Sequence, residues 1–206
     1  MADVRVKVCG ICRIEDAARA VDLGASAIGF IFWPGSPRCV EATVAREIAG
    51  TLPPHVTSIG VFVDEAIDRV EELAAAVPLG AVQLHGSESI GAFAHLRQPL
   101  IKAVAVTAGF QATDVDSLPS SVTVLLDAHD PIKRGGTGRT IDWTIAAAVA
   151  RRRPTILSGG LTAVNVADAI ARVQPQMIDV SSGVESAPGR KDPIKLKEFF
   201  AAVAAA

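Results

Sequence analysis

The chain has no excess of positive charge and no long apolar run. Its 20 basic and 22 acidic residues give a formal net charge of −2 at pH 7, which leaves no basic footprint for nucleic acid. No apolar run reaches the roughly 18 residues that a membrane-spanning helix needs. The N-terminal segment MADVRVKVCG has neither signal-peptide nor transit-peptide character. We therefore expect a cytoplasmic protein with no nucleic-acid partner and no membrane partner.

Cysteine is also scarce, and the three cysteines give no disulfide framework because their number is odd. Cys9 and Cys12 have the C-x-x-C spacing that zinc and redox sites use. A structural zinc site needs a second ligand pair, and the chain has no other pair of cysteine or histidine at ligand spacing. A redox C-x-x-C normally opens a helix, whereas Cys9 ends a predicted strand. We therefore expect no metal and no redox role, although a Cys9–Cys12 disulfide under oxidising conditions stays open.

What the chain does contain is a regular alternation of apolar runs and helical segments. The apolar runs predict eight strands, at Arg5–Cys9, Ser26–Phe32, Val56–Val63, Ala81–His85, Leu100–Val106, Val122–Leu126, Thr155–Leu157 and Met177–Ser181. The segments between them predict helices at Glu15–Leu23, Val40–Leu52, Glu65–Val77, Ser87–Leu96, Gly109–Leu118, Asp142–Arg151, Val164–Val173 and Ile194–Val203. The pattern over 109–118 is weak, so a poor helix is expected there.

Eight consecutive strand–helix units predict an α/β fold with a parallel sheet and right-handed crossovers. Such a sheet closes into a single (β/α)8 TIM barrel, which we expect to form one catalytic domain over residues 1–206. A barrel of this kind typically uses about 250 residues, so the loops must be short. The alternative is an open doubly wound sheet, which usually has fewer strands.

Strand side chains alternate between the two faces of a sheet, so Arg5, Lys7 and Cys9 share one face while Val6 and Val8 share the other. The valines suit contact with helices, and the polar trio suits the barrel lumen. Active sites of these barrels lie at the carboxyl ends of the strands. Cys9 stands at that end, and the same position on other strands is taken by the candidates His85, Asp127, Ser158 and Ser181.

Two glycine-containing loops follow the seventh and eighth strands, where such barrels usually bind phosphate. They comprise Ser158, Gly159 and Gly160 after the seventh strand, and Ser181, Ser182 and Gly183 after the eighth. Glycines let a phosphate approach the backbone N–H groups closely. We therefore expect a phosphorylated small molecule as substrate, held by these six residues.

The longest irregular connection, residues 128–140, contains Gly135, Gly136 and Gly138. It lacks the spacing of a nucleotide-binding P-loop. We interpret it as a cover that folds over the substrate and excludes water.

Seven motifs, in order along the whole chain, resemble those of the phosphoribosylanthranilate isomerase family. They are Lys7-Val8-Cys9-Gly10-Ile11, Ser36-Pro37-Arg38, Gln83-Leu84-His85-Gly86, Leu126-Asp127, Gly135-Gly136-Thr137-Gly138 with Asp142-Trp143, Ser158-Gly159-Gly160-Leu161, and Asp179-Val180-Ser181-Ser182-Gly183-Val184-Glu185. The resemblance implies a cofactor-free Amadori rearrangement in tryptophan biosynthesis, with Asp127 as general acid and Cys9 as general base. Cys12 departs from the family pattern, in which threonine is more common.

Each role requires the right protonation state. Lys7 lies one pleat repeat from Cys9, about 6.6 Å away, and at an effective dielectric of about 20 it supplies at most roughly 2.5 kcal/mol of attraction to a thiolate. We therefore expect Lys7 to lower the pKa of Cys9. Burial of Asp127 under the closed cover is expected to keep its carboxyl protonated.

The resemblance also assigns residues to the substrate's other groups. The planar fork of Arg38 suits the anthranilate carboxylate. Asp179 is expected to contact either the ribose hydroxyls or the anthranilate amine, and the sequence does not choose between them. His85 either lines the pocket or has a structural role, and these two interpretations are equally open.

Two other functions stay open on the sequence. One is another phosphate-binding barrel isomerase of histidine or tryptophan biosynthesis, although such isomerases use paired aspartates where this chain has Cys9 and Asp127. The other is a non-catalytic barrel that binds a sugar phosphate. The assembly is expected to be a monomer or a homodimer, with association with neighbouring pathway enzymes also open.

Overall fold

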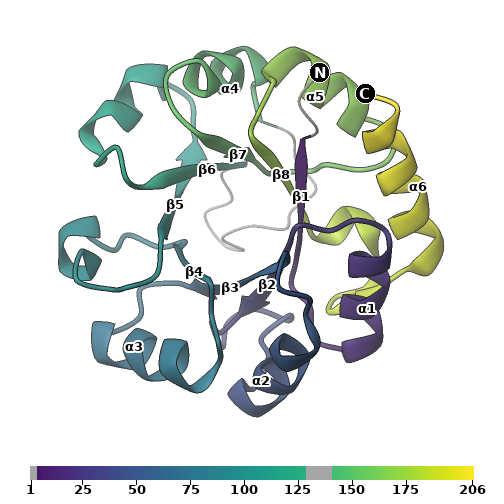
Figure 1. Ribbon diagram of the computed structural model, residues 1–206. Helices are drawn as coiled ribbons and strands as arrows, with labels where there is room; N and C mark the ends of the chain where they lie inside the picture. The colour runs from purple at the N-terminus through teal and green to yellow at the C-terminus, as the bar shows by residue number, and fades with distance from the viewer. Residues whose placement is uncertain (1–3, 129–140) are drawn as a thin grey trace.

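The computed structural model describes residues 4–128 and 141–206. Eight parallel strands pair in chain order and close into a barrel, since β1 pairs with both β2 and β8. Figure 1 looks along this barrel, with the strands in the middle and the helices around them. The predicted TIM barrel is confirmed. Its strands are β1 (Arg5–Cys9), β2 (Ala27–Ile31), β3 (Thr57–Phe62), β4 (Ala81–Leu84), β5 (Leu100–Val106), β6 (Thr123–Ala128), β7 (Thr155–Leu157) and β8 (Met177–Val180).

Helices cover the outside of most of the barrel, as predicted. They are α1 (Ile14–Asp22), α2 (Ala42–Thr51), α3 (Ile67–Ala76), α4 (Trp143–Ala150), α5 (Val166–Val173) and α6 (Pro193–Ala204). The start of α6 follows directly from its sequence. The carboxylate of Asp192 accepts the backbone N–H groups of Ile194 and Lys195, and Pro193 occupies the first turn, where its missing N–H is not needed.

The predicted α-helix at 87–96 is wrong, whereas the poor helix expected over 109–118 is a short 3₁₀ helix. The connection after β4 contains only the short 3₁₀ helix η1 (Ile90–Phe93), and the connection after β5 contains only η2 (Ala112–Ser117). In the first of these, the carboxylate of Glu88 accepts the backbone N–H groups of Asp64 and Gly86 at 2.7 and 2.9 Å. Glu88 thus fixes a turn where the predicted helix would begin, and Gly91 is a poor helix former within the remaining segment.

The apolar residues form two separate layers, as alternation along the strands requires. The larger layer lies between the sheet and the helices and includes Val6 and Val8 of β1. The smaller layer fills the amino-terminal part of the lumen, and its members are Ala27, Ile59, Ala81, Ile101, Ala103, Leu125, Ile156 and Met177. The lumen is therefore packed at one end, which leaves the carboxyl ends of the strands for polar side chains.

The sequence does not predict a small hairpin that follows β8. A 3₁₀ turn, η3 (Ser182–Val184), leads into β9 (Glu185–Ala187), which pairs antiparallel with β10 (Arg190–Lys191). Gly189, in the turn between these strands, has a φ of 75°, a conformation that favours glycine. The hairpin brings Glu185 opposite Lys191 in register.

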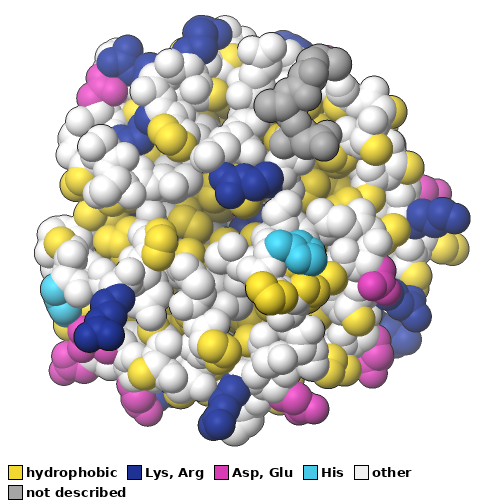
Figure 2. Space-filling model, in the orientation of Figure 1, with side chains coloured by type: hydrophobic (Ala, Val, Ile, Leu, Met, Phe, Trp, Pro, Cys, Tyr) yellow, Lys and Arg dark blue, Asp and Glu magenta, His cyan; other side chains and the backbone are white. Residues whose placement is uncertain are grey.

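The surface carries mixed charge on the face that Figure 2 shows. Basic and acidic side chains are interspersed around its edge, and neither sign forms a continuous patch. This distribution agrees with the balanced composition of the chain. Within residues 4–128 and 141–206, no helix has the length and apolar character that crossing a bilayer requires.

Candidate active site

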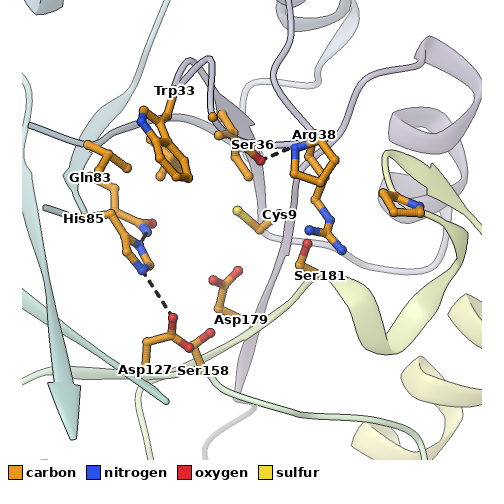
Figure 3. Close-up of a pocket in the computed structure, with 16 residues that line it drawn as sticks. Cys9, Trp33, Ser36, Arg38, Gln83, His85, Asp127, Ser158, Asp179 and Ser181 are labelled. Carbon is orange, nitrogen blue, oxygen red and sulfur yellow. Dashed lines mark hydrogen bonds and ion pairs between the residues drawn. The ribbon is translucent and has the colours of Figure 1, made fainter. Parts of the chain in front are cut away.

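Lumen-facing side chains surround a cavity of about 440 Å³, a size that suits a small-molecule ligand. The cavity brings together seven of the predicted site residues: Cys9, Arg38, His85, Asp127, Ser158, Asp179 and Ser181. Figure 3 shows these side chains around one space, with Cys9, Asp179 and Asp127 directed into it from different strands. Apolar side chains complete the wall, among them Ile31, Trp33, Val61, Val63 and Pro188.

The thiol of Cys9 is buried beside a strand position that has no side chain. Cys9 pairs with Gly29 of β2, and a Cβ placed on Gly29 would lie 2.8 Å from Sγ. Burial raises the pKa of the Cys9 thiol, and Lys7 offsets this effect only in part. Lys7 acts in the predicted direction, but desolvation of the thiolate outweighs its attraction, so the expected net lowering of the Cys9 pKa is wrong.

Lys7 is fully buried and forms an ion pair that the sequence did not predict. The register of β1 and β8 places Lys7 directly opposite Asp179, and Nζ lies 2.9 Å from Oδ1. Burial lowers the pKa of Lys7, but attraction to Asp179 and Cys9 outweighs it, so the pKa is raised overall. A fixed positive charge therefore lies below the cavity floor beside both acidic groups.

On the opposite side of the lumen, Asp127 is buried and contacts a chain of hydrogen bonds formed by His85 and Gln83. His85 Nε2 lies 3.2 Å from Asp127 Oδ2, and His85 Nδ1 lies 2.9 Å from the amide nitrogen of Gln83. An amide nitrogen that donates to Nδ1 leaves Nε2 as the ring nitrogen that can donate to Asp127. Gln83 Oε1 has no hydrogen-bond partner among the described residues. His85 is thus placed at the pocket, next to the predicted acid.

Arg38 lies in the loop after β2 and lines the cavity, as expected. Its guanidinium is held by Glu185, with Nε at 3.0 and 3.1 Å from the two carboxylate oxygens and Nη2 at 2.7 Å. The hydrogen bonds to Glu185 raise the pKa of Arg38, so the group stays charged. Gly10 permits this position, since a Cβ there would lie 2.7 Å from Cδ of Arg38.

The loops after β7 and β8 line a second cavity, of about 450 Å³. Its wall contains Gly160, Ser182 and Gly183, which were predicted to bind phosphate, and also Lys195 of α6, which was not predicted. A side chain on Gly183 would collide with the carbonyl oxygen of Leu161, so this close approach of the two loops requires glycine.

The other predicted phosphate residues lie between or beside the two cavities. Ser158 and Ser181 line the first cavity, and Gly159 connects Ser158 to Gly160. Gly159 and Gly160 have φ values of 88° and 63°, which side chains rarely allow. Ser181 Oγ is buried with no hydrogen-bond partner within the described part of the chain.

Three predicted site residues, Gly135, Gly136 and Gly138, lie outside the described residues. Within those described, no group of three or more histidine, cysteine, aspartate or glutamate side chains is placed to hold a metal ion. All three cysteines are free thiols, and the Cys12 thiol is directed toward the carbonyl oxygen of Arg38 at 3.4 Å.

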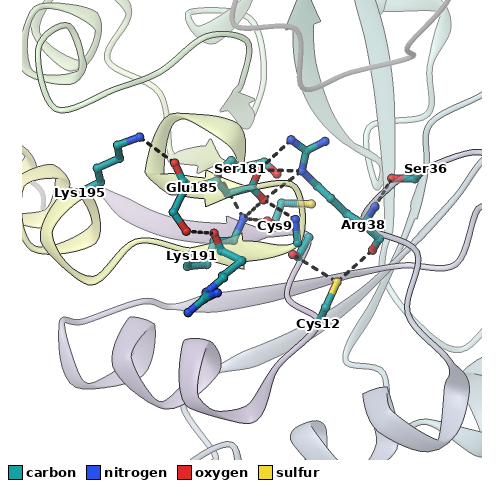
Figure 4. A network of polar contacts seen from close by, with 12 residues as sticks. Cys9, Cys12, Ser36, Arg38, Ser181, Glu185, Lys191 and Lys195 are labelled. Atoms are coloured by element: carbon teal, nitrogen blue, oxygen red, sulfur yellow. Dashed lines mark hydrogen bonds and ion pairs between the residues drawn. The ribbon is translucent and has the colours of Figure 1, made fainter.

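Sequence reasoning missed the buried partners Glu185 and Lys191, which Figure 4 shows beside Arg38 and Cys9. Lys191 Nζ donates to the Cys9 carbonyl oxygen at 2.6 Å and to Glu185 Oε1 at 2.8 Å. Glu185 belongs to a motif that carried the family resemblance, and this was the one available signal for it. Lys191 had none, because the hairpin that buries it is not apparent in the sequence.

A family model described as N-(5'phosphoribosyl)anthranilate (PRA) isomerase matches residues 6–202. The chain belongs to the phosphoribosylanthranilate isomerase family. The expected family is thereby confirmed over nearly the whole chain.

Members of this family with curated sequences or solved structures match the chain over nearly its whole length. An N-(5'-phosphoribosyl)anthranilate isomerase of Pseudomonas fluorescens (strain Pf0-1) is 47% identical over 204 residues, covering 98% of this chain and 100% of the relative. A structure of monomers generated from the dimeric phosphoribosylanthranilate isomerase of Thermotoga maritima is 38% identical, with a TM-score of 0.86 and coverage of 98% and 100%. A phosphoribosylanthranilate isomerase solved with reduced 1-(o-carboxyphenylamino)-1-deoxyribulose 5-phosphate is 39% identical, with a TM-score of 0.85 and the same coverage.

Proposed function

We propose that this chain, as a single barrel domain, converts N-(5-phosphoribosyl)anthranilate to 1-(2-carboxyphenylamino)-1-deoxyribulose 5-phosphate. The reaction requires two proton transfers. A general acid protonates the ribose ring oxygen, so that the furanose opens to an iminium ion, and a general base then removes the C2′ proton to give an enolamine. Tautomerisation of the enolamine gives the ketose product. The observation that supports this proposal most directly is that Cys9 of β1 and Asp127 of β6 line the same cavity.

Cys9 is proposed as the base that removes the C2′ proton. Because burial raises its pKa, the thiol is mostly protonated before substrate binds. The iminium ion places a positive charge in the cavity, and together with Lys7 it favours the thiolate at the step that needs it. The base is thus activated by the intermediate as well as by the protein.

Asp127 is proposed as the acid that opens the ring. The contact with His85 occupies Oδ2 and fixes the plane of the carboxyl group, which leaves Oδ1 to deliver the proton. No lysine or arginine among the described residues forms an ion pair with Asp127.

The remaining predicted residues bind the two ends of the substrate. Arg38 is proposed to hold the anthranilate carboxylate, and the loops after β7 and β8 to hold the phosphate, with Gly135, Gly136 and Gly138 covering the site. Asp179 uses Oδ1 for Lys7, so its other oxygen is left to accept a hydrogen bond from the anthranilate amine or a ribose hydroxyl.

The test is the fluorescence decay of substrate generated in situ from anthranilate and phosphoribosyl pyrophosphate. The wild-type chain should accelerate this decay, and Cys9→Ser and Asp127→Asn should each lower kcat by a factor of about 10² to 10⁴. Both variants should bind the reduced product analogue nearly as tightly as wild type, since neither residue is assigned to its carboxylate or phosphate. Full activity in either variant would contradict its assigned role, and no acceleration by the wild-type chain would contradict the function.

Assembly and location remain predictions. A homodimer is the assembly that the dimeric Thermotoga maritima relative favours over a monomer. Sedimentation velocity at several protein concentrations distinguishes the two. Cytoplasmic location and association with neighbouring pathway enzymes stay predictions from the sequence.

A further inference from the structure

The guanidinium of Arg38 has one edge occupied and one edge open. A guanidinium can bind a carboxylate through its Nε and Nη2 atoms or through its two terminal nitrogens. Glu185 occupies the first of these edges through three hydrogen bonds from Arg38. No partner of Nη1 is found within residues 4–128 and 141–206, and Arg38 lines the cavity. Glu185 therefore holds the guanidinium by one edge, and the second edge is available to another carboxylate.

This arrangement would be electrically neutral if Glu185 were the only partner of Arg38. Lys191 changes the balance, because its Nζ lies 2.8 Å from Glu185 Oε1 and is almost completely buried. Burial favours the neutral form of Glu185, but Arg38 and Lys191 outweigh this effect and lower its pKa. Burial lowers the pKa of Lys191, and attraction to Glu185 counteracts part of that change. Two cations and one anion leave the trio with a net charge of +1 to meet an incoming carboxylate.

Arg38, Glu185 and Lys191 are also fixed in place relative to the proposed base, Cys9. Lys191 Nζ donates to the backbone carbonyl oxygens of Cys9 and Ser181, at 2.6 and 3.2 Å. The hairpin of β9 and β10 carries both Glu185 and Lys191 and pairs them in register. Figure 4 shows the resulting network between this hairpin, the end of β1 and Arg38. The hairpin thus sets the distance between the proposed carboxylate-binding group and the proposed base.

We propose that Glu185 and Lys191 are positioning residues that aim the open edge of Arg38 at the carboxylate of the substrate's aryl amine. The β9–β10 hairpin is then a determinant of specificity for a carboxylated aryl group. This inference rests on the proposed function of Arg38. Neither Glu185 nor Lys191 touches the reacting atoms, so their effect reaches the reaction through Arg38.

The test compares two substrates that differ only in the carboxylate: phosphoribosylanthranilate and its aniline counterpart, prepared from aniline and ribose 5-phosphate. The measured quantity is the ratio of kcat/KM for the two. Glu185→Gln should lower this ratio about tenfold, the effect of one lost charge-assisted hydrogen bond, mainly through KM of the anthranilate substrate. The aniline substrate should keep its wild-type kcat/KM. Arg38→Met should lower the ratio further.

Glu88→Gln is the matched control, because Glu88 and Lys102 form a comparable buried pair at 2.9 Å on the other side of the barrel mouth. It should leave the ratio unchanged even if it lowers stability. If Glu185→Gln does not fold, Glu185→Asp replaces it as the test variant. Aspartate keeps the negative charge but draws the guanidinium back by one methylene length. That variant should also lower the ratio.

The outcomes separate the inference from the function on which it rests. An unchanged ratio in Arg38→Met would overturn the proposed role of Arg38 itself. A lowered ratio in Arg38→Met with a wild-type ratio in both Glu185 variants would overturn only the positioning role. An equal loss for both substrates in the Glu185 variants would also overturn it, because a purely structural defect does not distinguish a carboxylate from a hydrogen atom.

Discussion

The two sides of the cavity stabilise their polar groups in different ways. On the side of β1 and β8, the polar groups are buried ions: Lys7 pairs with Asp179, and Arg38 and Lys191 share Glu185. These pairs lie at 2.7 to 2.9 Å with side chains that are at most 11% exposed. Their charges therefore act on the cavity with little screening by solvent.

On the side of β4 and β6, the carboxyl group of Asp127 faces the cavity, and the ion pair of Glu88 and Lys102 is not part of the cavity wall. His85 and Gln83 form a hydrogen-bonded chain behind Asp127, and the described residues place no lysine or arginine in ion-pair contact with it. The difference matches the proposed chemistry. A thiolate and a bound carboxylate are stabilised by nearby cations, whereas a general acid needs a partner that orients its carboxyl group.

The largest expected effect comes from removing a cation from the charged side. Lys7→Met leaves the Asp179 carboxylate buried and unpaired, which should lower the free energy of unfolding by about 3 kcal/mol. Gln83→Met is the matched change on the side of β4 and β6, at a position that is also almost fully buried and also faces the lumen. It should cost only about 1 kcal/mol, the value of one ordinary hydrogen bond. Urea unfolding measures both, and equal costs would show that the two sides do not differ in this respect.

A smaller effect is expected from pH, because the charged side carries Glu185, whose pKa is lowered by Arg38 and Lys191. The pKa of Glu185 lies below its ordinary value of 4.5. Its stabilising effect is therefore fully present above that value and is lost as the pH falls through the pKa of the folded state. At neutral pH, Glu185→Gln should lower the free energy of unfolding by about 2 kcal/mol, and this difference should shrink on acidification.

The control for this pH dependence is Gly50→Ala, whose added Cβ would meet no atom within 4 Å. Because this change touches no titratable group, its difference from wild type should stay constant from neutral pH to about pH 3. Urea unfolding at a series of pH values gives both curves. A difference for Glu185→Gln that does not change with pH would mean that the carboxylate's charge contributes nothing to the stability of the hairpin.

Strand periodicity was enough to predict which side chains face the cavity. Cys9, Asp127 and Asp179 all alternate with buried apolar residues that face the helices, and a period of two leaves no choice of face. The order of eight strand–helix units then placed those strands around one lumen. The positions of these residues therefore followed from local sequence and a single rule of topology.

The partners of those residues could not be predicted in the same way. Lys7 meets Asp179 because of the register between the first and last strands, and Lys191 meets Glu185 because of a short hairpin. Both depend on contacts between elements. The error over the pKa of Cys9 has a related cause, since a sequence shows a nearby charge but not the loss of water around the thiol.

The smallest expected effect tests the space around the base and leaves every charge in place. Gly29→Ala puts a Cβ 2.8 Å from Sγ of Cys9 and 3.1 Å from its Cα, so the thiol has to move. This crowding should cost about 1 kcal/mol of stability. We expect kcat to fall about fivefold, less than the tenfold of one lost hydrogen bond, because the base is displaced but retained.

Gly50→Ala, near the end of α2, is the control for Gly29→Ala, since a Cβ there meets no atom within 4 Å. It should raise stability by about 0.5 kcal/mol through helix propensity and leave kcat unchanged. Urea unfolding and the fluorescence assay measure both variants. Wild-type kcat in Gly29→Ala would mean that the position of the thiol is not critical, and the cations on this side would then matter for substrate binding and stability more than for the base.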